Sequence, residues 1–297
     1  MTIANATTKL HENKICLVTG ANSGIGRETA LGLARSGATV ILVCRDRSKG
    51  EVALSEVKKA SGNKRVVLLT ADLTLASDIQ TLQSDVKDKF GHLNVLINNA
   101  GAIFGARNTT EEGVELTFAT NHLNYFMMSH AFLNLLRAGA KEIGLRSRIV
   151  NVASEAHRQV KSETFDWQCE NTEFKPMNVY GLSKLANILF TRELAQRLNP
   201  AECTVNCLHP GVVRTGFGSN NDWGFLGFLF NAARPFLLSP EQGAKTSLYL
   251  ATEDSPAESH GAYFKNCKEA RPSQFAFNEQ MSKNLWDTSI KLTGMGH

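Results

Sequence analysis

A glycine-rich turn near the start of the chain is compatible with only a few folds. Residues 14–20 form a short, β-branched apolar run that ends in Gly20, as buried parallel strands do. The turn 21–26 follows, with Gly24 and Gly26, and a helical pattern continues from it through Arg35. Glycines let the backbone approach a pyrophosphate, and a helix start offers free N–H groups and the positive end of its dipole. This order of elements predicts a nucleotide-binding α/β fold. A glycine-rich turn without a ligand is the alternative.

Strand-like and helix-like segments alternate along the rest of the chain, the pattern of a doubly wound parallel sheet. Strands are predicted at residues 14–19, 38–44, 65–70, 93–98, 147–152, 203–208 and 261–265. Helices are predicted at residues 24–36, 46–60, 75–90, 111–137, 178–198, 240–252 and 275–292. No repeat, low-complexity tract or linker interrupts the pattern. We therefore expect one Rossmann-like α/β domain over residues 1–297, with seven parallel strands and helices on both faces.

The composition argues against several other classes of protein. The net charge of +4 is small and scattered, so we expect no nucleic-acid partner. The six cysteines are dispersed and form no Cys-x-x-Cys pair or His/Cys cluster, so we expect no metal site and a reducing compartment. The N-terminal extension 1–13 is polar, and no run approaches the ~18 apolar residues of a membrane span. These features predict a cytoplasmic protein without a transmembrane segment.

Tyr180 and Lys184 stand four residues apart in a stretch that reads as helix, so the phenol and the ammonium share one helical face. A free phenol titrates near pH ~10, and lowering its pKa by three units takes about 4 kcal/mol. One cation roughly 4 Å away in a partly buried site supplies energy of that order. The pair predicts a phenol that exchanges protons near neutral pH, although the same spacing also occurs on ordinary exposed helices.

Further motifs follow the predicted strands, and through them the chain resembles the short-chain dehydrogenase/reductase family. They lie between residues 14 and 265 in the order of that family: Thr19-Gly20-x-x-x-Gly24-x-Gly26, Asn98-Asn99-Ala100-Gly101, Asn121, Ser154, Tyr180, Lys184 and Pro210-Gly211. Within the family, the chain resembles the retinol dehydrogenase branch, which includes retinal reductases. Three segments and one residue carry this second likeness: Val43-Cys44-Arg45-Asp46, residues 180–194, Gly261-Ala262-Tyr263-Phe264 and Trp286.

The resemblance implies hydride transfer between a substrate carbon and a nicotinamide ring. Tyr180 would be the general acid for carbonyl reduction and the base for alcohol oxidation. Lys184 would bind the nicotinamide ribose and lower the phenol's pKa. Ser154 would hold the substrate oxygen, and Asn121 would hold a water that relays protons to Lys184. The family often has two serines where this chain has Ala153 and Ser154, which leaves Ser154 as the only hydroxyl of that doublet.

The choice of cofactor depends on the residue after the second predicted strand. An acidic residue there binds the ribose of NAD, whereas a guanidinium pairs with the 2′-phosphate of NADP. Arg45 occupies this place and favours NADP(H) over NAD(H), although it could simply open a helix capped by Asp46. The resemblance implies cofactor contacts at Gly20, Asn22, Ser23, Gly24, Ile25, Gly26, Arg45, Asp72, Leu73, Asn99, Ala100, Gly101, Tyr180, Lys184, Pro210, Gly211, Val213 and Thr215.

Two kinds of feature lie beside these motifs. Residues 212–239 are rich in aromatic side chains and glycine, which favours a lid over an apolar substrate, with packing into the core as the alternative. His122, His157 and His209 neighbour the motifs but form no ligand set, so we expect them to support the site or to lie on the surface.

The resulting hypothesis is an NADP(H)-dependent oxidoreductase that interconverts an alcohol and an aldehyde or ketone, with a bulky apolar substrate such as a retinoid. The alternatives are a reductase of steroids, other lipids or small carbonyls, and a non-catalytic protein that senses nucleotides. Members of this family commonly form dimers or tetramers through the helices near 111–137 and 178–198, so assembly into a homo-oligomer stays open. Peripheral membrane contact also stays open, because several retinol dehydrogenases carry an N-terminal anchor that this sequence does not show.

Overall fold

The strands form one sheet whose winding reverses at its centre. The computed structural model describes residues 11–213 and 237–295, and the strand order is β3-β2-β1-β4-β5-β6-β7-β8. The strands are β1 (Ile15–Thr19), β2 (Thr39–Cys44), β3 (Val66–Thr70), β4 (Val95–Asn98), β5 (Ser147–Val152), β6 (Cys203–His209), β7 (Tyr263–Lys265) and β8 (Lys268–Glu269). All neighbours from β3 to β7 pair in parallel. The α/β, Rossmann-like architecture expected from the sequence is therefore confirmed.

The sheet has an eighth strand that the sequence did not predict. β8 is only two residues long and pairs antiparallel with β7 at the edge. Asn266 and Cys267 form the turn between them, both with left-handed φ angles, of 52° and 57°. A strand this short has no readable alternation of apolar and polar residues, so the prediction of seven strands was one short.

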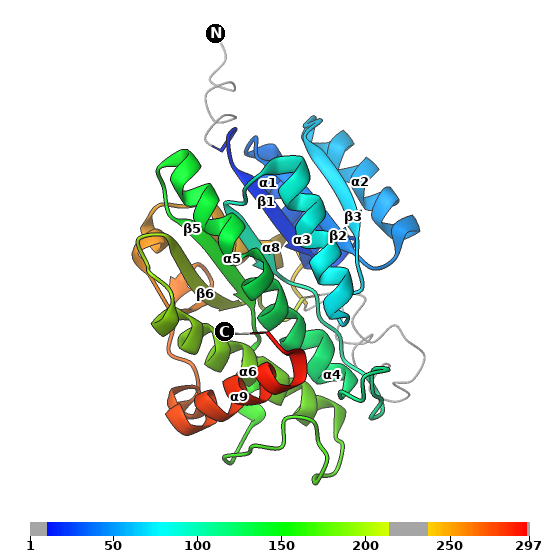
Figure 1. The fold of residues 1–297 in the computed structure, drawn as a ribbon, viewed down its shortest axis with the longest axis vertical. Coiled ribbons are helices and arrows are strands. Elements are labelled where there is room, and N and C mark those ends of the chain that lie inside the picture. The colour runs from blue at the N-terminus through cyan, green and yellow to red at the C-terminus, as the bar shows by residue number, and fades with distance from the viewer. Residues whose placement is uncertain (1–10, 214–236, 296–297) are drawn as a thin grey trace.

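Helices cover both faces of the sheet (Figure 1). They are α1 (Gly24–Arg35), α2 (Arg47–Ser61), α3 (Ala76–Phe90), α4 (Leu116–Phe118), α5 (Asn124–Ile143), α6 (Pro176–Arg197), α8 (Pro240–Thr252) and α9 (Glu279–Thr293), with a π-helical turn η2 (Ala119–Leu123) and 3₁₀ turns η3 (Glu155–Gln159), η6 (Ser255–Glu258) and η7 (Gln274–Phe277). Successive β1 side chains point to opposite faces. Leu17 packs in the core under α3, α5 and α6, and Val18 packs in the core under α1, α2 and α8.

The helix expected over residues 111–137 begins later than predicted. Thr109 and Glu115 form an antiparallel bridge that closes a turn through Gly113, whose φ is +81°. The Glu115 carboxylate then accepts hydrogen bonds from the backbone N–H groups of Thr117 and Phe118, at 2.8 and 2.7 Å. A side chain that caps the first free N–H groups defines a helix start, so the helix cannot extend back through residues 111–115.

The C-terminal helix α9 lies across α5 and α6. Trp286 of α9 is buried, and its ring centroid is 5.2 Å from that of Phe126 and 6.0 Å from that of Phe190. His122 is also fully buried, and its Nε2 lies 2.9 Å from the hydroxyl of Ser289 on α9. Part of the surface formed by α5 and α6, where the sequence left assembly open, is thus packed against a helix of the same chain.

Two sequence-based expectations can be compared only in part with the structure. Most of the expected lid at 212–239 and of the extension at 1–13 lies outside the described residues, which lack 214–236 and 1–10. Within residues 11–213 and 237–295, no helix is both long enough and apolar enough to cross a bilayer.

Candidate active site

The predicted motifs meet at one edge of the sheet. Gly20 follows β1, Asn99 follows β4, Ser154 follows β5 and Pro210 follows β6, all at the carboxyl ends of parallel strands. The winding of the sheet reverses between β1 and β4. Ligands of open α/β sheets bind at such a reversal because the loops on either side diverge and leave a crevice.

The turn after β1 can be built only with glycine at two of its positions. Gly20 has a φ of +64°, and a Cβ there would stand 2.9 Å from Cα of Ala100. A Cβ on Gly26 would collide with the carbonyl oxygen of Gly20. The backbone of this turn therefore approaches the β4 loop and the start of α1 more closely than any side chain would permit.

Thr19 joins this turn to the loop after β4. Its hydroxyl accepts hydrogen bonds from the backbone N–H groups of Asn99 and Ala100 at 2.9 and 3.0 Å. The Asn99 side chain in turn donates to the Thr19 carbonyl oxygen at 2.8 Å. Thr19 belongs to the glycine motif, but the motif did not indicate this role for its hydroxyl. Its position before the first glycine was the available signal.

The start of α1 is suited to an anion. Ser23 is the N-cap residue, yet its side chain makes no capping hydrogen bond, and no acidic residue occupies the first turn of the helix. Uncapped N–H groups and the positive end of the helix dipole favour a bound negative charge. Asn22, Ser23 and Ile25 lie in this turn with the glycines, so the residues present fit the pyrophosphate of a dinucleotide.

Arg45 extends from the end of β2 beside Asp72. Its side chain is 77% exposed, and its only ion pair in the described chain is a 3.5 Å contact between its Nη1 and Asp72 Oδ2. Asp46 caps α2 by accepting from the N–H of Lys49 at 3.0 Å, so the helix cap expected from the sequence is confirmed. Burial raises the pKa of Asp72, but hydrogen bonds from Thr74 and the charge of Arg45 outweigh it and hold that pKa below its ordinary value. The neighbouring Leu73 is buried.

Tyr180, Lys184 and Ser154 come together beneath this edge. The Lys184 amine is buried, donates a hydrogen bond to the carbonyl oxygen of Val152 at 2.9 Å, and lies 5.7 Å from the centre of the Tyr180 ring. The side chain of Ser154 is hydrogen-bonded to Tyr180. The three groups predicted to act together are therefore neighbours in the structure.

The titration of this cluster differs from the sequence-based expectation. Burial raises the pKa of Tyr180 to about 12, opposed by its hydrogen bond with Ser154. Burial also lowers the pKa of Lys184 to about 7. The prediction that the phenol's pKa is lowered is thus wrong, because burial raises it. Desolvation favours the neutral form of each group, which raises the pKa of the phenol and lowers that of the amine.

Asn121 lies in the π-helical turn and holds the site together through its side chain. Its Oδ1 accepts from the N–H of Ala102 at 2.7 Å, and its Nδ2 donates to the Ala102 carbonyl at 2.9 Å and to the Ser183 hydroxyl at 3.0 Å. Both amide protons are therefore engaged, so a relay water would have to use the remaining lone pair of Oδ1 or the backbone of the turn. Gly101 passes so close that a Cβ there would lie 3.0 Å from Asn121 Oδ1 and 3.5 Å from Lys184 Nζ.

A hydrogen-bond network that the sequence did not reveal supports the Ser154 loop. The Glu155 carboxylate accepts from the Tyr263 hydroxyl at 2.7 Å and from the Lys265 amine at 3.1 Å. These contacts, together with the charge of Arg158, outweigh the effect of burial and lower the pKa of Glu155 to about 2. Only the position of Glu155, directly after Ser154, could have drawn attention to it.

Two of the three histidines near the motifs also hold this loop. His157 donates through Nδ1 to the Ser154 carbonyl at 2.6 Å and accepts at Nε2 from the N–H of Ser273 at 3.0 Å. His209 accepts through Nδ1 from the N–H of Glu155 at 3.2 Å. Burial lowers the pKa of both, to about 4 for His209. They are neutral buried supports rather than surface residues.

The structure describes the loop after β6 as far as Val213. Gly211 has a φ of +93°, where a side chain would be strained, and any Cβ would collide with Leu238. Val213 pairs with Leu238 in a parallel bridge. Thr215, the last predicted cofactor contact, lies outside the described residues.

The chain is similar to several known proteins. A family model described as short chain dehydrogenase matches residues 14–223. The chain is 38% identical over 285 residues to retinol dehydrogenase 11 of Mus musculus, which covers 95% of this chain and 87% of that protein. It is 36% identical over 288 residues to retinol dehydrogenase 13 of Homo sapiens, covering 95% and 85%. The crystal structure of an uncharacterised protein from Mycobacterium paratuberculosis superposes with a TM-score of 0.75 at 28% identity and covers 98% of this chain and 96% of that one.

The family model spans most of the chain, and the retinol dehydrogenases align along nearly all of it. The chain therefore belongs to the short-chain dehydrogenase family of oxidoreductases.

Proposed function

We propose that this protein is an NADP(H)-dependent oxidoreductase that interconverts an alcohol and an aldehyde or ketone, and that its substrate is bulky and apolar, such as a retinoid. The observation that carries the proposal is the grouping of Ser154, Tyr180 and Lys184 beside a glycine turn suited to a pyrophosphate. A protein that only senses nucleotides has no need to keep these three side chains together.

The side chains divide the chemistry as follows. A bound nicotinamide dinucleotide supplies the hydride for reduction or accepts it in oxidation. Tyr180 keeps its proton at neutral pH because its pKa is raised, so it can donate that proton to a carbonyl oxygen. The Ser154 hydroxyl, which is hydrogen-bonded to Tyr180, orients the carbonyl oxygen of the substrate. Lys184 holds the end of β5 against α6, and Asn121 holds the Ala102 segment beside it.

The preference for NADP(H) rests on Arg45. Its guanidinium is exposed at the end of β2, and among the described residues its one ion pair is a long contact to Asp72, so a phosphate can displace or share that contact at little energetic cost. A guanidinium pairs with a phosphate through two parallel hydrogen bonds. The glycine turn, the loop after β4 and the Pro210 loop would hold the rest of the cofactor.

The substrate class rests on relatives. Retinol dehydrogenases 11 and 13 act, as their names state, on retinol, and they align along nearly the whole of this chain. We therefore propose an apolar alcohol or aldehyde as the first substrate to test with this protein.

The test is turnover of all-trans-retinal with NADPH, measured as retinol separated by chromatography, with steroid ketones and small aldehydes assayed in parallel. We expect retinol to form and Tyr180→Phe to reduce turnover by at least about 100-fold, the order that general acid catalysis contributes. Tyr125→Phe is the matched control, since Tyr125 also lies beside Lys184 but its hydroxyl faces the Val152 carbonyl. Retention of full turnover by Tyr180→Phe would remove that residue from proton transfer. Absence of turnover with every carbonyl would contradict the proposed function.

A further inference from the structure

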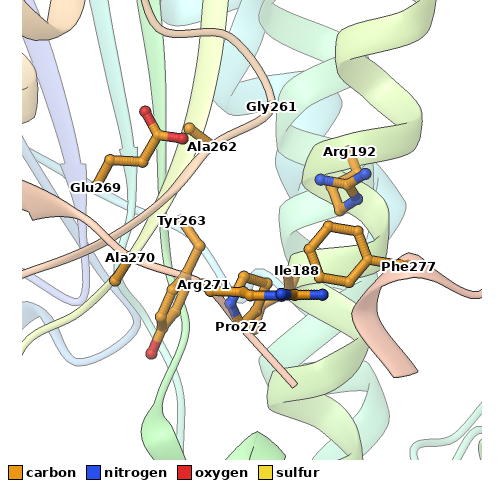
Figure 2. A pocket seen from close by; sticks show the side chains of 10 residues that line it. All are labelled: Ile188, Arg192, Gly261, Ala262, Tyr263, Glu269, Ala270, Arg271, Pro272 and Phe277. Carbon is orange, nitrogen blue, oxygen red and sulfur yellow. The ribbon is translucent and has the colours of Figure 1, made fainter. Parts of the chain in front are cut away.

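A second pocket lies outside the candidate active site. It measures about 470 Å³, opens between α6, the start of β7 and the segment from β8 to η7, and is drawn in Figure 2. Ile188 and Arg192 of its α6 wall lie about one and two helical turns beyond Lys184. Tyr263 separates the two sites, because its ring lines the pocket while its hydroxyl bonds to Glu155 beside Ser154. A volume of this size suits a small ligand.

Two guanidinium groups without carboxylate partners line one side of this pocket. The guanidinium carbon of Arg192 lies 4.4 Å from the centre of the Phe277 ring, and that of Arg271 lies 5.8 Å from the same point. None of the ion pairs in residues 11–213 and 237–295 includes either arginine. Figure 2 shows both guanidinium groups beside Phe277. Positive charge is thus gathered around one aromatic ring, a pairing that stabilises cations without neutralising them.

The other side chains that line the pocket form an apolar surface and include one carboxylate. Ile188, Pro272 and Phe277 present aliphatic and aromatic surface, and Phe277 is 43% exposed. Glu269 stands on the opposite side of the pocket in Figure 2 and is not ion-paired with either guanidinium. A ligand that fits this lining has a negatively charged end toward the arginines and an apolar body along the other side chains.

We propose that this pocket binds a small amphiphile with one anionic head group, a carboxylate or a phosphate, joined to an apolar chain. Arg192 and Arg271 hold the head group through charge-assisted hydrogen bonds. Ile188, Pro272 and Phe277 cover the first part of the apolar chain and remove it from water. The site is independent of the reaction at Tyr180, so its test needs no turnover.

The experiment is isothermal titration calorimetry of the full chain in the presence of NADP⁺. The probes are decanoate, decyl phosphate, decanol and inorganic phosphate, and the first two separate the two sources of the head group. The variants are Arg192→Gln, Arg271→Gln and the double variant. Arg137→Gln is the control, because Arg137 is half-buried like Arg192 and pairs with Glu202 outside the pocket. Thermal melts establish that each variant folds.

We expect at least one of the two anionic amphiphiles to bind, each single substitution to weaken binding about tenfold, and the double substitution to weaken it further. Arg137→Gln should bind like the parent, and added salt should weaken binding to the parent. Equal affinity of the parent and the double variant would overturn the proposal, since the probe would then sit elsewhere, for example in the substrate cleft. Decanol or inorganic phosphate binding as tightly as the amphiphiles, or no binding by either amphiphile, would also overturn it.

Discussion

The amine of Lys184 donates a hydrogen bond to the carbonyl oxygen of Val152 at 2.9 Å. This contact joins α6, which carries Tyr180, to the end of β5, two residues before Ser154. Lys184 therefore fixes the distance between the two elements that carry the proton donor and the oxygen-binding hydroxyl. A cation is not required for this role, which fits a lysine whose pKa burial has lowered to about 7.

The two directions of the reaction should respond differently to pH, with reduction nearly constant and oxidation rising. Because the pKa of Tyr180 is raised to about 12, the phenol stays protonated from pH 6 to 10 and can serve as an acid throughout. Alcohol oxidation needs the phenolate, whose fraction rises up to tenfold with each pH unit below that pKa. Initial rates of both directions across this range measure the effect. Oxidation that slows as pH rises would contradict the assignment.

Replacing Lys184 should abolish activity but increase the stability of the folded chain. Its pKa is about 7 in the folded chain and ordinary in the unfolded chain, so between these values the unfolded chain binds the proton that the folded chain does not. Stability of the parent therefore rises with pH over this window, and the burial penalty is largest near pH 7. Lys184→Met should be inactive, yet gain stability relative to the parent, more at pH 7 than at pH 10.

Urea unfolding of Lys184→Met and the parent at the two pH values tests this expectation. Lys141→Met is the control, because Lys141 is exposed at the end of α5 and its replacement should leave the pH dependence unchanged. A stability difference between Lys184→Met and the parent that is the same at both pH values would show that burial of the amine is not the cause.

Removing the support of the Ser154 loop should impair turnover more than cofactor binding. Glu155→Ala leaves the Tyr263 hydroxyl and the Lys265 amine without this acceptor, so the loop that carries Ser154 is held less firmly. We expect kcat/KM to fall about tenfold, equivalent to about 1.4 kcal/mol, with an unchanged Kd for the dinucleotide. Glu163→Gln is the control, since Glu163 is an exposed carboxylate that bonds only to the Asn278 side chain in the described chain. A selective loss of cofactor affinity would place Glu155 in a different role.

Arg45→Asp should reverse the cofactor preference. The substitution removes the guanidinium and places a second carboxylate beside Asp72, where it would repel a 2′-phosphate and accept from ribose hydroxyls. We expect kcat/KM with NADPH to fall by about 100-fold or more, since a charge-assisted pair is worth about 1.5–3 kcal/mol and repulsion adds to its loss. Arg47→Gln is the control, because Arg47 pairs with Glu51 on the exposed side of α2. A parent enzyme that already prefers NADH would contradict the role of Arg45.

Local patterns in the sequence were sufficient to predict the first half of the site. The β1 strand, its glycine turn and α1 could be placed because apolar runs, glycine spacing and helical periodicity are all read within a few residues. The four-residue spacing of Tyr180 and Lys184 correctly placed them near each other. The same spacing could not reveal that Lys184 is buried and Tyr180 half-buried, and this loss of contact with water decides the direction of both pKa shifts.

Contacts between distant segments account for what the sequence did not reveal. Glu155 and Tyr263 are 108 residues apart, and neither residue alone indicates the hydrogen bond between them. The start of the helix after residue 111 depends on the bridge between Thr109 and Glu115 rather than on helical propensity. β8 exists because a two-residue turn folds it back on β7.

The packing of Trp286, on α9, leads us to expect an activity that does not depend on protein concentration. The ring meets Phe126 of α5 edge to face and stacks on Phe190 of α6, with the guanidinium of Arg197 4.1 Å from its centre. A second copy is therefore not needed to keep these aromatic side chains out of water. Specific activity should stay constant as the enzyme is diluted, whereas a protein that shields the same helices by pairing would lose activity below its dissociation constant.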